Sequence, residues 1–145
     1  MEEGLVRVTP DKERAKSIMK MVDTTLELVK TVDADRFSSN VVKDYYDVIR
    51  EMLSVVLLLD GLKTHGEGAH RKLIAYTGKA YMLFTEHELL LIDDLRTVRN
   101  KIAYDGFFVP SDYLPRNKEA IETVIDKLKR FVNEKLNEET RRVSV

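Results

Sequence analysis

Three residues near the end of one predicted helix carry side chains suited to binding a phosphate: Arg99, Asn100 and Tyr104. A guanidinium binds phosphate through two parallel N–H donors, and an asparagine amide both donates and accepts hydrogen bonds. A tyrosine ring stacks on a nucleobase or donates its hydroxyl to a phosphate. Tyr104 follows Arg99 by five residues, about 140° around a helix but one turn further along. Together these side chains predict a nucleotide-binding cleft.

Arg99 lies on the apolar face of this helix, an unusual place for a charge. At about 100° per residue, it falls within an arc of about 140° that holds the apolar side chains. These side chains are those of Leu91, Ile92, Leu95, Val98, Ile102 and Ala103. A guanidinium cannot lose its proton, and burying it unpaired costs several kcal/mol. Arg99 therefore requires an anionic partner or a solvated cleft.

The helical wheel leaves three interpretations of Arg99 open. It forms a structural ion pair with a carboxylate of a neighbouring helix, for which Asp94 and Asp60 are candidates. Alternatively, its long side chain extends from the edge of the apolar face into solvent. In the third interpretation, Arg99 lines a cleft, often at a subunit interface, and binds a phosphate through two N–H groups.

The elements that must position these residues are helices. Apolar residues recur at helical spacing in five segments, and no segment has a convincing period of two. The predicted segments are 10–32, 41–62, 69–75, 85–104 with its cap, and 116–136. Thr9 caps the first, Gly78 closes the short third, and Thr85 with Glu88 forms a capping box before the fourth. The 41–62 segment is apolar nearly all round toward its end, which predicts a central helix.

This pattern predicts an all-α protein, an up-and-down four-helix bundle with an additional short helix. A chain of 145 residues suits one domain, 1–145, with its core at about 9–138. The loop at 107–115 carries Phe107, Phe108, Val109 and Tyr113. These apolar residues either pack over the end of the bundle or form a docking surface for a partner.

Composition excludes several classes of function. Lys and Arg number 24 against 25 Asp and Glu, so no general basic field draws in DNA, and any nucleic-acid contact must be a local patch. Cysteine is absent, which excludes disulfides, thiolate metal sites and a cysteine nucleophile. No apolar run approaches the roughly 20 residues of a membrane span, and the N-terminus does not resemble a signal peptide. We expect a cytoplasmic protein without a membrane partner, and the abundance of Lys and Glu favours a thermophilic source.

No cofactor is predicted. The sequence has neither a P-loop nor a Rossmann glycine pattern, and no Gly-x-Ser-x-Gly elbow. His65, Glu67 and His70 lie in or beside a glycine-containing loop, but their spacing matches no established metal motif. We therefore predict no metal site.

The segment Arg99-Asn100-Lys101-Ile102-Ala103-Tyr104 resembles the Arg-Asn-x-x-x-His/Tyr signature of HEPN domains, small helical bundles named as nucleotide-binding in higher eukaryotes and prokaryotes. A second similarity lies upstream. Asp44-Tyr45-Tyr46 opens a helix that ends in Leu57-Leu58-Leu59-Asp60-Gly61, followed by His70 and Leu73-Ile74, much as in small prokaryotic HEPN proteins. The resemblance covers roughly residues 43–104.

The resemblance implies a homodimer in which the arginine motifs of two subunits surround one cleft. It also implies a minimal nucleotidyltransferase as partner, in a pair of toxin–antitoxin type, and RNA or a nucleotide as ligand. Many HEPN proteins are metal-independent ribonucleases that use the motif arginine and histidine. Tyrosine takes the histidine position here, and its unperturbed pKa of about 10 makes it a poor base at pH 7. A binding protein is thus the leading hypothesis; a ribonuclease using Arg99 and Tyr104 and a purely structural interaction protein are the alternatives.

Overall fold

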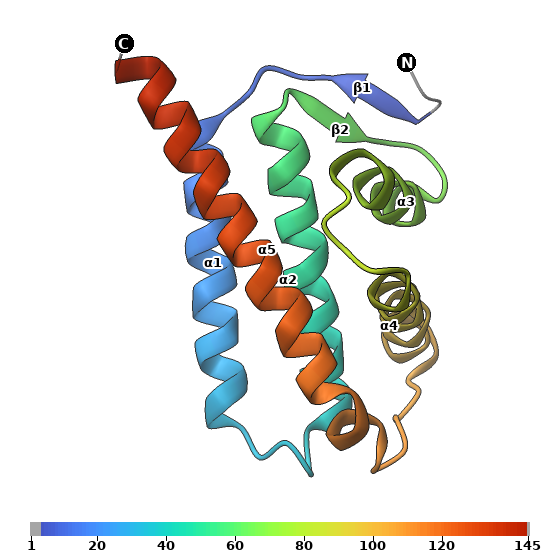
Figure 1. Ribbon diagram of the computed structural model, residues 1–145. Coiled ribbons are helices and arrows are strands. Elements are labelled where there is room, and N and C mark those ends of the chain that lie inside the picture. The colour runs from blue at the N-terminus through green and yellow to red at the C-terminus, as the bar shows by residue number, and fades with distance from the viewer. Residues whose placement is uncertain (1–3, 145) are drawn as a thin grey trace.

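Five helices and two short strands make up the part of the chain that the computed structural model describes, the backbone of residues 4–144 with side chains through 138 (Figure 1). The helices are α1 (Lys12–Thr31), α2 (Ser38–Leu59), α3 (Ala69–Tyr81), α4 (Glu86–Asp105) and α5 (Tyr113–Ser144). The predicted all-α helical bundle is confirmed. Within the described residues, none of the helices is both long and apolar enough to traverse a bilayer.

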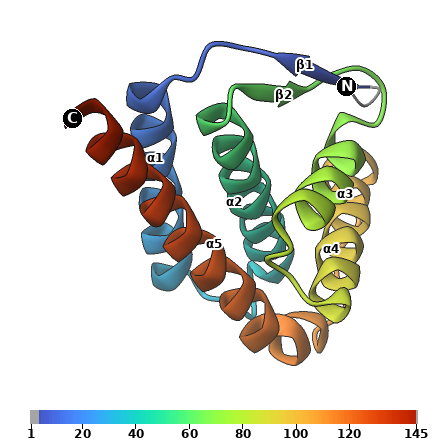
Figure 2. The ribbon, with the colours of Figure 1, turned by 45° about the horizontal axis from the view of Figure 1, so that its top comes forward.

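Helix α2 is the central helix of the bundle, as predicted. Helices α1 and α5 lie on one side of it, and α3 and α4 lie on the other (Figures 1 and 2). Thirteen of its 22 residues are buried, more than one face of a helix supplies, so α2 contacts neighbours around most of its circumference. Any polar side chain on α2 that faces α3 or α4 is therefore held between helices.

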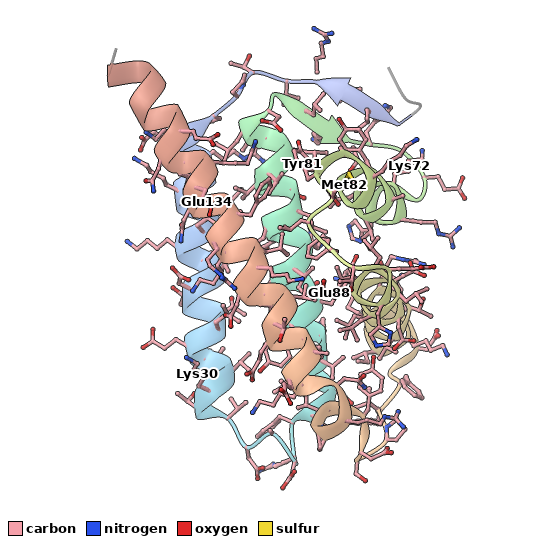
Figure 3. All side chains as sticks on the ribbon, viewed as in Figure 1. Lys30, Lys72, Tyr81, Met82, Glu88 and Glu134 are labelled. Carbon is pink, nitrogen blue, oxygen red and sulfur yellow. The ribbon has the colours of Figure 1, made fainter. Side chains whose placement is uncertain are left out.

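Both ends of α4, the helix that carries Arg99, are fixed by local hydrogen bonds. At its start, the Glu88 N–H donates to Thr85 Oγ1 at 3.1 Å and the Thr85 N–H donates to Glu88 Oε1 at 2.9 Å, which confirms the predicted capping box. Glu88, labelled in Figure 3, also accepts a hydrogen bond from Lys127 Nζ of α5 at 2.6 Å. At the other end, Gly106 adopts the left-handed conformation, with φ 64°. These contacts define where α4 begins and ends.

Two three-residue strands were not predicted. Strand β1 (Leu5–Arg7) pairs antiparallel with β2 (Leu62–Thr64), with Val6 opposite Lys63. Strands of three residues are too short to show a period of two. The predicted helix over 41–62 stops at Leu59 because Gly61, with φ 73°, turns the chain into β2, and a Cβ there would lie 3.0 Å from the Val8 carbonyl oxygen.

The predicted cap of α1 and the predicted end of α3 are also wrong. Asp11, not Thr9, caps α1, and its carboxylate accepts the Arg14 N–H at 2.9 Å. Gly78 does not close α3, which continues to Tyr81. A Cβ at Gly78 would lie 2.7 Å from Leu89 Cδ2, so the glycine lets α4 approach α3 closely. Figure 2 shows these two helices side by side.

Helix α5 extends the predicted 116–136 segment in both directions. Tyr113, expected in a loop, is its first residue, and the helix reaches Ser144. Val109 and Tyr113 are buried, and the Val109 N–H donates to Ser39 Oγ at 2.9 Å. These two residues therefore pack over the end of the bundle, whereas Phe108 is 83% exposed.

Candidate functional site

Three arginine side chains, which we call the arginine cluster, lie where α2, α3 and α4 meet. Arg50 comes from α2, and Arg96 and Arg99 come from α4. Arg96 and Arg99 are three residues apart and so share a face of their helix. The positive charges of all three act on the pKa of the same tyrosine, Tyr46 of α2. The bundle thus brings three guanidinium groups from two helices near one buried side chain.

Arg99 forms an ion pair with Asp47 of α2. Its Nε donates to Asp47 Oδ1 at 3.2 Å, and its Nη1 donates to Asn100 Oδ1 at 3.4 Å. The Arg99 side chain is 17% exposed and that of Asp47 is 27% exposed, so the pair reaches solvent. A guanidinium carries five N–H donors, and these two contacts within the described residues engage only two of them. The ion pair therefore leaves other N–H donors of Arg99 without a hydrogen-bond partner among the described residues.

The two carboxylates expected as partners of Arg99 have other partners. Asp94 accepts the Tyr113 hydroxyl at 2.8 Å. Asp60 accepts Lys135 Nζ at 2.8 Å and the Tyr81 hydroxyl. The expectation was wrong because both groups are held by residues far along the chain: Tyr113 and Lys135 of α5, and Tyr81 of α3.

The Tyr46 side chain is completely buried, yet its hydroxyl has no hydrogen-bond partner in the described part of the chain. Burial raises the pKa of Tyr46 to about 12, although the nearby arginines act in the opposite direction. Arg50 Nε is likewise buried without a partner among the described residues. A buried polar group without a partner costs about 1–3 kcal/mol. Two such groups lie in the same region of the bundle, and buried polar groups of this kind normally have a hydrogen-bond partner.

His70, in the first turn of α3, lies beside Tyr46 with 6.3 Å between ring centroids. Burial lowers the pKa of His70 below 6.5, and the charges of Arg50 and Arg99 lower it further, while Asp47 raises it. The imidazole is therefore mostly neutral at pH 7 and is able to accept a proton. Three helices thus contribute to one site.

Carboxylates partly neutralise the arginine cluster. Arg96 Nε lies 2.9 Å from Asp93 Oδ1, and Arg50 Nη2 lies 3.9 Å from Glu51 Oε1. Burial raises the pKa of Glu51, and repulsion from Asp47 adds to the increase. Each arginine of the cluster thus lies within 4 Å of a carboxylate, and these carboxylates are partly solvated.

The structure brings together only part of the predicted site. Asn100 contacts Arg99, but Tyr104 is 77% exposed, and none of the hydrogen bonds in the described chain joins it to either residue. Sequence reasoning about Arg99 missed Arg50, Arg96 and Asp47. The signal was present on α2: Tyr46 and Arg50 are four residues apart and share a face of the helix.

His65, Glu67 and His70 do not form a metal centre. Among the described residues, no group of three or more histidine, cysteine, aspartate or glutamate side chains is arranged to hold a metal ion. His65 and Glu67 are exposed in the loop before α3, whereas His70 turns toward Tyr46.

Comparison with family models, with curated proteins and with solved structures finds no match to this chain. The arrangement of side chains between α2, α3 and α4 is accordingly the basis for assigning a function.

Proposed function

We propose that this protein is a HEPN-like protein that binds the phosphate of a nucleotide or RNA at the arginine cluster. The observation that carries the proposal is that the Tyr46 hydroxyl and Arg50 Nε are both buried without a partner among the described residues, in a region where the charges of Arg50, Arg96 and Arg99 all act on Tyr46. Phosphate oxygens accept hydrogen bonds from arginine and from tyrosine, so one anion satisfies both kinds of donor. Asn100, beside Arg99, adds an amide donor at the same edge.

The proposal extends to partners. Exposed aromatic side chains stand at the C-terminal end of α4, and such apolar surface is typical of protein contacts. They are Tyr104 (77% exposed), Phe107 (39%) and Phe108 (83%). We assign this surface to a partner contact, either in a homodimer or with a minimal nucleotidyltransferase in a pair of toxin–antitoxin type. In this role Tyr104 binds a partner or stacks on a base and does not act as a proton acceptor.

Replacing Arg99 with alanine tests the phosphate site. We expect the variant to bind a fluorescent single-stranded RNA about tenfold more weakly, because a charge-assisted contact contributes about 1.5 kcal/mol or more. Fluorescence anisotropy at fixed salt measures the change, and the salt dependence of binding becomes shallower. Arg116→Ala is the matched control, because Arg116 is 67% exposed and pairs with Asp112 at 3.6 Å. Equal affinities of the Arg99→Ala variant and the wild type would contradict the proposal.

Asp47→Asn breaks the same ion pair from its other side and carries the opposite expectation. Removing the competing carboxylate leaves Arg99 free for the ligand, so RNA affinity rises, by about threefold to tenfold for one partly solvated charge. The free energy of unfolding falls at the same time, because Arg99 loses its partner. A purely structural ion pair predicts that both variants lose stability and that neither changes RNA affinity. Anisotropy and urea unfolding on the same preparations separate these results.

A metal-independent ribonuclease is the second candidate function. The observation that favours it is His70: a neutral imidazole lies near three cations, which is the combination needed to move a proton and stabilise a phosphorane. His70 would supply the proton acceptor that Tyr104 cannot supply.

A further inference from the structure

A cavity of about 370 Å³ opens between α1, α2, β2 and α3, next to the arginine cluster. Its apolar lining consists of Ile18, Leu57, Leu58, Leu62, Ala69 and Leu73. Arg50 and His70 also line it, and both belong to the surroundings of the phosphate site. The cavity thus shares Arg50 with the arginine cluster, and His70 lies in its wall beside that cluster.

Polar groups are set into this apolar lining. Ser54 of α2 and Thr64 of β2 contribute hydroxyls, and Glu51 is the only carboxylate among the described lining residues. The remaining charges are positive, those of Arg14, Arg50 and Lys63. The buried Arg50 Nε without a partner belongs to a residue of this wall. A matching ligand is therefore flat or apolar in part, has hydrogen-bonding edges, and carries negative charge.

We propose that this cavity binds the base and sugar of a nucleotide whose phosphate lies at the arginine cluster. This inference rests on the proposed function and specifies its ligand as a mononucleotide or the terminal nucleotide of an RNA. The volume falls within the range of about 300–1,000 Å³ found for small-molecule sites. The leucine side chains contact the faces of the base, and Ser54 and Glu51 accept its N–H donors.

Cavity chemistry favours a nucleotide over an alkyl phosphate. A hydrocarbon chain would fill the apolar lining but would bury Ser54, Thr64 and Glu51 without partners, at about 1–3 kcal/mol for each neutral group. A base edge offers both donors and acceptors to these groups. The guanidinium of Arg50 also stacks on aromatic rings, an interaction that an alkyl chain lacks.

The test fills the cavity without altering the arginine cluster. Ser54 is half-buried, so Ser54→Phe places a ring in the cavity, and Ser111→Phe, at an exposed loop position, is the matched control. Isothermal titration calorimetry with AMP and GMP is expected to show at least a tenfold loss of affinity for Ser54→Phe and no loss for the control. Inorganic pyrophosphate, which needs only the cluster, is expected to bind all forms equally. Circular dichroism checks folding, and Thr64→Trp on β2 replaces Ser54→Phe if that variant does not fold.

Unchanged AMP and GMP affinity in a folded, cavity-filled variant would overturn the cavity assignment, as would failure of the wild type to bind either nucleotide. In both cases, loss of pyrophosphate or RNA binding on Arg99→Ala would leave the proposed function standing. Absence of all phosphate binding in the wild type would instead refute both. Octyl phosphate that binds as tightly as AMP and competes with it would assign the cavity to a lipid chain and overturn the nucleotide.

Discussion

Leu95→Ala is expected to lower the free energy of unfolding by about 3 kcal/mol, within the range of about 2–5 kcal/mol for a buried leucine. Leu95 belongs to α4, and its side chain is completely buried. The substitution removes apolar surface from the core and leaves a cavity that the surrounding helices fill only in part. Urea unfolding followed by circular dichroism measures the change.

Leu90→Ala is the control for this prediction, since it makes the same substitution in the same helix at a side chain that is 65% exposed. We expect it to change stability by less than about 0.5 kcal/mol. Equal losses in the two variants would show that α4 does not pack on α2 through Leu95. This packing also matters for function, because Leu95 precedes Arg96 and lies one turn before Arg99. Loosening α4 separates these arginines from Arg50 of α2.

The helices and the central position of α2 could be predicted from sequence patterns. These patterns depend on interactions between residues close together in the chain and on burial of apolar side chains. The capping box of Thr85 and Glu88 depends only on neighbours in the chain, and it begins α4 where predicted. Helix α2 is buried because other helices surround it, and its many apolar residues indicate this position. In contrast, Gly78 allows α3 to lie close to Leu89 of α4. This contact between helices is not visible in the local sequence, so the glycine was predicted to end the helix.

The candidate site was predictable only in part for the same reason. The position of Arg99 on an apolar face correctly required a carboxylate or a solvated cleft, and the structure has a partly solvated carboxylate, Asp47. Which carboxylate it is depends on the packing of α2 against α4, across 52 residues of sequence. Tyr104 shares the helix of Arg99, but the 140° between them places it outside the cluster, 77% exposed. Instead, His70 of α3 lies at the site, beside Tyr46.

Metal-independent cleavage of RNA by the second candidate function is expected to depend on His70 and not on Tyr104. In this reaction the imidazole accepts the proton of a ribose 2′-OH, whose oxygen attacks the adjacent phosphorus. The bond to the 5′ oxygen breaks, that oxygen takes a proton from water, the imidazolium returns its proton to solvent, and a 2′,3′-cyclic phosphate remains. Arginine N–H groups stabilise the charge on the pentavalent phosphorus. The roles require a neutral imidazole and permanently charged guanidinium groups, which matches the lowered pKa of His70.

With labelled RNA in EDTA, His70→Ala is expected to reduce cleavage at least 100-fold, the usual lower limit for loss of a general base. Tyr104→Phe should keep the wild-type rate, and His87→Ala, at an exposed position on α4, is the histidine control. The rate should rise with pH through the pKa of His70, below 6.5, and level off by pH 7, because only the neutral imidazole accepts a proton. Cleavage that survives His70→Ala would exclude this mechanism. RNA binding that needs Arg99 without any cleavage would leave the protein as a binding module, since the cations of the site act on a phosphate whether or not the imidazole moves a proton.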